Sequence, residues 1–170
     1  TSDFTWYNPI PAIMGNSGTQ LNYLEVNITS DHPGTLKIML ISPTGISLVL
    51  SAFHGAGGQN YTNSLFLPSG APNITTGTAP FTGNWLPEGV GGFSVFNGAT
   101  AQGTWTVRVI DTLCNQNVYP GGGALTNGYF DGGAGSGGFA IFPCSFTQST
   151  NIVNLCPGEY YDASIYYTPV

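Results

Sequence analysis

The chain carries very little charge, and basic residues in particular are almost absent. Lys and Arg together number 2, Asp and Glu number 8, and the charged fraction is 6%, whereas an average globular domain has roughly 25%. The formal net charge is −6. Nucleic acids and anionic lipid surfaces are bound by clustered Lys and Arg, and here only Lys37 and Arg108 are available. The composition therefore argues against both kinds of partner.

Long apolar runs and helical periodicity are missing as well. No run of about 18 apolar residues is present, so the sequence predicts no membrane span. No long segment repeats apolar residues at i, i+3 and i+4, so we expect no substantial helix.

Cysteines are few, and none is spaced for zinc. They are Cys114, Cys144 and Cys156, and an odd number in an oxidising compartment indicates one disulfide with one thiol left over, or a bond to another chain. If strands at 104–111 and 138–142 pair antiparallel, Cys114 and Cys144 lie at opposite ends and cannot bond. We favour Cys114 with Cys156, and Cys144 with Cys156 remains the alternative.

Glycine and uncharged polar residues fill the places that charges usually take. The chain has 25 Gly and many Ser, Thr and Asn, yet 41% of its residues are hydrophobic and 13% are aromatic. This hydrophobic content is sufficient for a core and is unlike that of a disordered chain. We interpret the composition as that of an extracellular protein.

Short segments of alternating hydrophobicity predict an all-β fold. In 36–40 and 104–111 every second residue is apolar and is expected to face the core. Pro43 and Gly45 predict a tight turn after the first of these, because Pro presets φ and Gly tolerates a positive φ. Many short strands separated by turns are typical of a β-sandwich or barrel. The predicted strands are 24–28, 36–40, 46–50, 104–111, 139–142 and 164–167.

Three stretches of the chain resemble the motifs of a known domain family. GTLKIMLISPTGISLVL, residues 34–50, resembles a motif with Gly-Asp-Leu, a strand, Ser-Pro-x-Gly-Thr and an apolar strand. APFTGNWLPEG, 79–89, and FSVFNGATAQGTWTVRVIDT, 93–112, resemble the later part of the domain. The matching residues are Gly34, Leu36, Ser42, Pro43, Gly45, Pro80, Gly103, Thr104, Trp105 and Asp111. The family that these motifs resemble is the P domain of kexin-like and furin-like proprotein convertases and of many bacterial secreted proteins.

This resemblance implies a jelly-roll β-sandwich without catalytic activity, which stabilises or regulates an adjoining subtilisin-like protease or forms part of a large surface protein. We expect an N-terminal extended segment at 1–21, the jelly roll at 22–142, and a C-terminal extension with an added strand at 143–170. The chain departs from the family at Thr35, where relatives have Asp, and in a Gly-rich insertion at 114–137.

The sequence contains no recognisable catalytic set. The only histidines, His32 and His54, fall in predicted loops, and no serine stands in a nucleophile-elbow motif. We therefore predict no catalytic residue and no enzymatic activity. Asp31 and Asp111 are candidate calcium ligands, because calcium is bound by several oxygens from loops.

Four further residues are candidates for glycan chemistry. Asn27, Asn60 and Asn73 begin Asn-x-Thr sequons and are candidate glycosylation sites. Trp85 lies in a predicted loop and is a candidate glycan contact, whereas Trp105 is expected in the core.

The leading hypothesis is a non-catalytic extracellular module that acts as a structural subunit or adhesive part of a cell-surface assembly, including a filament. The tyrosine-containing ends, 1–13 and 159–170, are the segments expected to complete a neighbour's sheet by strand addition. The alternatives are an accessory P domain of a secreted subtilisin-like protease and a carbohydrate-binding module. The expected partners are other copies of the chain, neighbouring domains of a surface protein, or a glycan.

Overall fold

The structure, a computed structural model, describes residues 1–9, 11–16, 19–28, 30 and 32–112, with only the backbone of Ser2 and Trp6. It also describes the backbone of 151–153 and 161–163. Over these ranges the regular structure consists of strands and short 3-10 turns, without an α-helix, as the sequence predicted. None of the described helical turns is long and apolar enough to cross a membrane.

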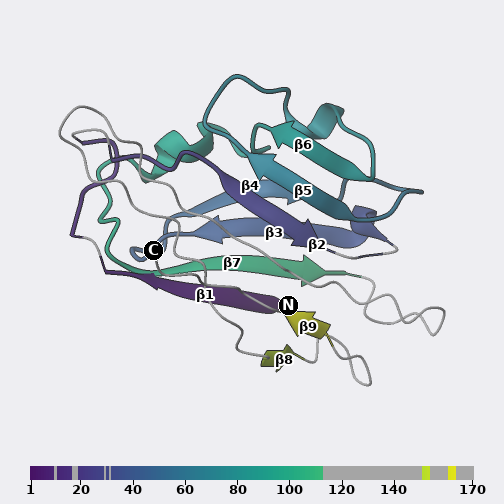
Figure 1. Cartoon of the computed structure of the whole chain (residues 1–170), viewed down its shortest axis with the longest axis horizontal. Coiled ribbons are helices and arrows are strands. Elements are labelled where there is room, and N and C mark those ends of the chain that lie inside the picture. The colour runs from purple at the N-terminus through teal and green to yellow at the C-terminus, as the bar shows by residue number, and fades with distance from the viewer. Residues whose placement is uncertain are drawn as a thin grey trace.

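The larger sheet has the order β1-β7-β3-β4, and its neighbouring strands are antiparallel (Figure 1). Its strands are β1 (Ser2–Asn8), β3 (Leu36–Ile41), β4 (Ser47–Ala52) and β7 (Gly103–Asp111). β1 comes from the predicted N-terminal extended segment and pairs along its whole length with β7.

The second sheet has the order β2-β5-β6; in Figure 1 β5 and β6 are at the top, and β2 overlaps β3 in this view. β2 (Leu24–Ile28) runs antiparallel to β5 (Tyr61–Phe66), and β6 (Phe81–Trp85) runs parallel to β5. Two further strands, β8 (Asn151–Val153) and β9 (Tyr161–Ala163), pair antiparallel. The 3-10 turns are η1 (Pro33–Thr35), η2 (Ile74–Thr76) and η3 (Gly92–Phe96).

One hydrophobic core joins the two sheets, and the alternation in β3 and β7 points into it. Leu36, Ile38 and Leu40 are buried, as are Trp105, Val107 and Val109, which confirms their predicted inward orientation. The Trp105 indole packs edge-on against Phe96 with ring centroids 5.2 Å apart, and its Nε1 donates to the Ala101 carbonyl at 2.8 Å. Burial of each large apolar side chain contributes roughly 1.5–3 kcal/mol to stability.

The predicted hairpin between β3 and β4 is present. Gly45 has φ +84°, and its N–H donates to the Ser42 carbonyl at 2.9 Å. The Ser42 hydroxyl also accepts from the Ile46 N–H at 3.1 Å. β4 begins one residue later than predicted, at Ser47, and Ile46 stays partly exposed.

Five strands in the described residues, β1, β5, β6, β8 and β9, were not among the predicted ones. In β5, Asn63 has φ +47°, and the β5–β6 register shifts between Thr62 and Ser64. In β6, Gly83 has φ +82° and only Phe81 is fully buried. Such irregularities interrupt the alternation of apolar and polar residues, so the sequence of these strands does not show the two-residue period of a strand. The predicted strands at 139–142 and 164–167, the insertion at 114–137 and the three cysteines lie outside the described residues.

Candidate docking site

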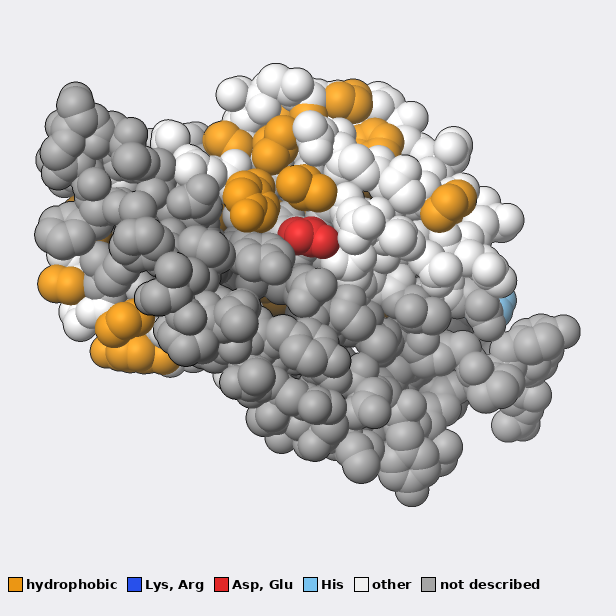
Figure 2. Space-filling view, viewed as in Figure 1, with side chains coloured by type: hydrophobic (Ala, Val, Ile, Leu, Met, Phe, Trp, Pro, Cys, Tyr) orange, Lys and Arg blue, Asp and Glu red, His pale blue; other side chains and the backbone are white. Residues whose placement is uncertain are grey.

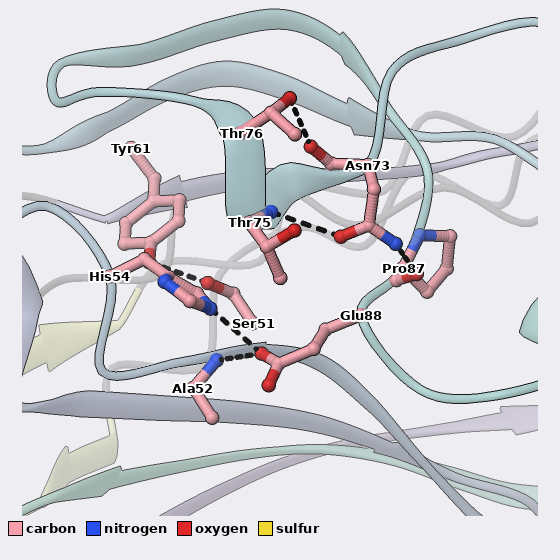
Figure 3. Close-up of polar contacts among 9 residues, drawn as sticks. All are labelled: Ser51, Ala52, His54, Tyr61, Asn73, Thr75, Thr76, Pro87 and Glu88. Carbon is pink, nitrogen blue, oxygen red and sulfur yellow. Dashed lines mark hydrogen bonds and ion pairs between the residues drawn. The ribbon is translucent and has the colours of Figure 1, made fainter.

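Three segments meet beyond the ends of β4 and β6, and we call their combined surface the loop face. It consists of residues 52–58, 73–77 and 86–92. Figure 3 shows the polar contacts that join these segments to one another and to the strands beneath them.

Glu88 connects two of the three segments. Its Oε2 accepts a hydrogen bond from the Ala52 N–H at 2.8 Å and lies 3.1 Å from His54 Nε2 (Figure 3). Its own backbone N–H donates to the Leu50 carbonyl at 3.1 Å, and the Gly89 N–H donates to the Val49 carbonyl at 2.9 Å. The segment therefore continues the outer edge of β4, and its carboxylate holds the 52–58 loop.

Asn73 connects the third segment, 73–77, to the 86–92 segment. Its Oδ1 accepts from the Thr75 N–H at 3.0 Å, which caps η2, and its Nδ2 donates to the Pro87 carbonyl at 3.0 Å (Figure 3). The Ile74 N–H also donates to the Leu86 carbonyl at 3.1 Å, and the Leu86 N–H donates to the Pro72 carbonyl at 2.7 Å. Side-chain capping of this kind contributes about 1 kcal/mol, so the three segments form a fixed surface.

A buried tyrosine supports the loop face from below. Tyr61 is 1% exposed, and its ring stacks on Phe81 with centroids 4.7 Å apart. Its hydroxyl lies 3.0 Å from Ser51 Oγ (Figure 3). Burial raises the pKa of Tyr61 to about 12; the hydrogen bond with Ser51 opposes this shift, and the nearby charge of Glu88 adds to it. The hydroxyl therefore stays protonated and does not act as a base near neutral pH.

The loop face presents two exposed hydrophobic side chains. Val90 is 96% exposed and Phe53 is 50% exposed. Phe53 has φ +62°, which is a rare and strained conformation for a bulky residue. Its N–H donates to the Leu36 carbonyl at 2.8 Å, so the backbone that carries the ring is anchored to β3. Backbone strain of this kind is concentrated at active sites, ligand clamps and switch regions.

Glycines explain how the 52–58 loop lies so close to the second sheet. A Cβ added to Gly55, which has φ +91°, would stand 2.7 Å from the Phe81 ring, and one added to Gly58 would stand 2.6 Å from Ala79 Cβ. Only glycine allows this approach.

The described residues near the loop face do not assemble a catalytic set. His54 is bonded to Glu88, and in this part of the structure no hydroxyl is hydrogen-bonded to it. The Ser51 hydroxyl is bonded to Tyr61. Acyl transfer requires a nucleophile within reach of its base, so the geometry gives no support to hydrolysis.

The candidate calcium ligands are only partly described. Asp111 Oδ1 accepts from the Thr35 hydroxyl at 2.8 Å, whereas Asp31 lies outside the described residues. Within those residues no group of three or more His, Cys, Asp and Glu comes together to hold a metal ion. Calcium binding by Asp31 and Asp111 stays a prediction.

Trp85 is the last residue of β6 and does not stand in a loop. Its ring is partly buried against the core, at 6.1 Å from the Phe81 ring centroid and perpendicular to it. A Cβ at Gly77 would meet the indole at 2.7 Å. A glycan contact through Trp85 therefore stays a prediction, and packing accounts for its position. The cysteines lie outside the described residues, so their pairing also stays a prediction.

Sequence reasoning missed both Glu88 and Phe53. Glu88 has no local sequence signal, because it stands 36 positions from the Ala52 N–H that it binds. Nothing in the sequence marks Phe53, because a positive φ is usually signalled by Gly or Asn.

A family model of the proprotein convertase P-domain matches residues 22–120, which is more than half of the chain. The chain belongs to the proprotein convertase P-domain family. This confirms the resemblance seen in the sequence, and the observed all-β sandwich agrees with it. P domains are non-catalytic accessory domains of secreted proteases and normally pack against the protease catalytic domain. β1 precedes the matched range. No curated protein matches the chain significantly.

Proposed function

We propose that this P domain is a non-catalytic extracellular module that docks on a neighbouring protein domain through the loop face. The observation that carries the proposal is Phe53, whose ring is held half-exposed at a positive φ. Val90 adds a second exposed apolar contact, and the contacts of Glu88 and Asn73 hold the surrounding segments in place. A pre-organised surface loses less entropy on binding.

The charge of the chain fits the same proposal. With 6% charged residues, the chain offers little electrostatic attraction, so an apolar anchor has to supply the binding energy. Figure 2 shows one side of the molecule, where hydrophobic side chains lie among largely uncharged surface beside an acidic side chain, and no Lys or Arg is seen among the described residues. The partner is therefore expected to present an apolar pocket, as a protease catalytic domain or another domain of a surface protein would.

The structural-subunit and filament hypothesis receives less support. Residues 2–8 pair with β7 of their own chain, so this segment is already used and does not favour strand donation to a neighbour. The packing of Trp85 on the core likewise does not favour a carbohydrate-binding module.

Site-specific cross-linking tests the proposal. A photo-reactive phenylalanine analogue is placed at position 53 or 90 of the secreted protein in the producing cells, and at Thr82 as a matched control. Thr82 is an exposed residue of β6 that belongs to none of the three segments. We expect positions 53 and 90 to join the chain to the same protein. No adduct, or an equal adduct from position 82, would rule out docking through the loop face.

A further inference from the structure

The three Asn-x-Thr sequons differ in what the Asn side-chain amide does in the folded chain. N-glycosylation attaches a sugar to Nδ2, so the surroundings of this atom decide whether a glycan is compatible with the fold. All three side chains are described, and all three accept hydrogen bonds through Oδ1. They differ at Nδ2.

Asn27 uses both ends of its amide. Its Oδ1 accepts from the Asn63 N–H at 2.6 Å, and its Nδ2 donates to Glu25 Oε1 at 2.9 Å. The β2–β5 ladder shifts register between Val26 and Ile28, and the Asn27 side chain bridges the two strands at this irregularity. A sugar on Nδ2 would occupy the space next to Glu25 and disrupt the hydrogen bonds that Asn27 makes with Glu25 and Asn63.

Asn73 also uses both ends. Oδ1 caps η2 at the Thr75 N–H, and Nδ2 donates to the carbonyl of Pro87 (Figure 3). Pro87 is buried. A sugar at this nitrogen would have to enter between η2 and the 86–92 segment, and it would separate two parts of the loop face.

Asn60 is different. Its Oδ1 accepts from the Ser30 N–H at 2.8 Å, its N–H donates to the Ser30 carbonyl at 2.9 Å, and its carbonyl accepts from the Phe81 N–H at 3.1 Å. Across the described residues no acceptor is bonded to its Nδ2. The residue is partly exposed, and Thr62 of the same sequon is exposed. The fold therefore fixes the Asn60 backbone and carbonyl oxygen while leaving Nδ2 unused.

We propose that Asn60 is the glycan-bearing sequon when the chain is made in a compartment that N-glycosylates, and that Asn27 and Asn73 are structural. A lipid-linked oligosaccharide pyrophosphate supplies the sugar. The bond from sugar C1 to the pyrophosphate oxygen breaks, a bond from C1 to Nδ2 forms, Nδ2 loses a proton, and the lipid pyrophosphate leaves. Transfer that precedes folding reaches all three sequons, so the fold selects among the products. This inference does not depend on the docking function.

Secretion from a eukaryotic host that N-glycosylates tests it with the full chain. Intact mass and peptide mapping with a chymotrypsin-like protease give the occupancy of each sequon in the secreted and in the retained protein. Trypsin is unsuitable because the chain has only 2 basic residues. We expect the secreted protein to carry one glycan, on Asn60. Chains modified at Asn27 or Asn73 are expected only in the retained fraction.

Matched variants separate the glycan from the side-chain role. Thr62→Ala removes the Asn60 sequon and keeps the hydrogen bond to Ser30, so it is expected to abolish the modification without lowering the unfolding midpoint. Asn73→Gln and Thr75→Ala both remove the Asn73 sequon, but only Asn73→Gln is expected to lower the midpoint. Secreted, folded protein with a glycan on Asn27 or Asn73, or with Asn60 unmodified, would overturn the inference.

Discussion

Replacing Phe53 by Asn separates docking from stability. A left-handed backbone costs a non-glycine residue about 1–2 kcal/mol, and Asn tolerates this conformation better than Phe. Because the Phe53 side chain is 50% exposed, its loss removes roughly half of the 1.5–3 kcal/mol that full burial would contribute. The two effects oppose each other, so we expect Phe53→Asn to change the free energy of unfolding by less than about 1 kcal/mol.

Urea denaturation followed by tryptophan fluorescence measures this change, with an unchanged m-value as a check that the transition is comparable. Phe81→Ala is the matched control, because Phe81 is fully buried, and its truncation is expected to cost about 3–5 kcal/mol. The same Phe53→Asn protein is expected to bind the cross-linked partner at least ~30-fold more weakly, as loss of an aromatic anchor worth about 2 kcal/mol would give. A destabilisation by Phe53→Asn as large as that of Phe81→Ala would show that Phe53 is a core residue, and normal binding would show that it is not an anchor.

Three further predictions concern single side chains. The pKa of Tyr61 is raised from its ordinary value of 10.0 to about 12 in the folded chain. The free energy of unfolding is therefore highest below pH 10 and falls by about 2–3 kcal/mol as the pH rises to 12. Unfolding curves of Tyr61→Phe, measured at alkaline pH, should lack this fall. The hydrogen bond from Arg108 lowers the pKa of Asp3 below 3.8. The pair therefore contributes to the free energy of unfolding above pH 3.8, and this contribution is lost as the pH falls further. Because the pair is exposed, Asp3→Asn should remove less than about 1 kcal/mol near neutral pH, measured by thermal unfolding at low and high salt. Glu88→Ala leaves the Ala52 N–H unpaired and should cost about 1–3 kcal/mol in urea denaturation; an unchanged midpoint would show that Glu88 does not hold the loop face.

The hairpin and the core strands could be predicted because their sequence signals are local. In β3 and β7 every second residue is apolar, and Pro43 with Gly45 marks the turn between β3 and β4. In β5 and β6 the signal fails, since Asn63 and Gly83 take positive φ values and interrupt the alternation. β1 depends on pairing with β7, about a hundred positions away, and no local pattern reports such a pairing.

The candidate docking site could not be predicted, because it depends on contacts between distant segments. Glu88 becomes a connecting residue only when the 86–92 segment lies along β4. The sequence marks Asn73 as a sequon, but its cap contact with the Thr75 N–H and its hydrogen bond to the Pro87 carbonyl appear only in the folded chain. The strained backbone of Phe53 has no sequence signal at all. Local patterns therefore predicted the fold class, and tertiary pairing determined the site.

Hydrogen–deuterium exchange of the free chain and of its complex with the protein that cross-links from residue 53 tests docking through the loop face most directly. We expect slower exchange in the complex at amides of 52–58 and 86–92, and unchanged exchange at the exposed residues 82–84 of β6. Equal exchange of the loop face in the two states, or protection confined to another surface, would contradict the account.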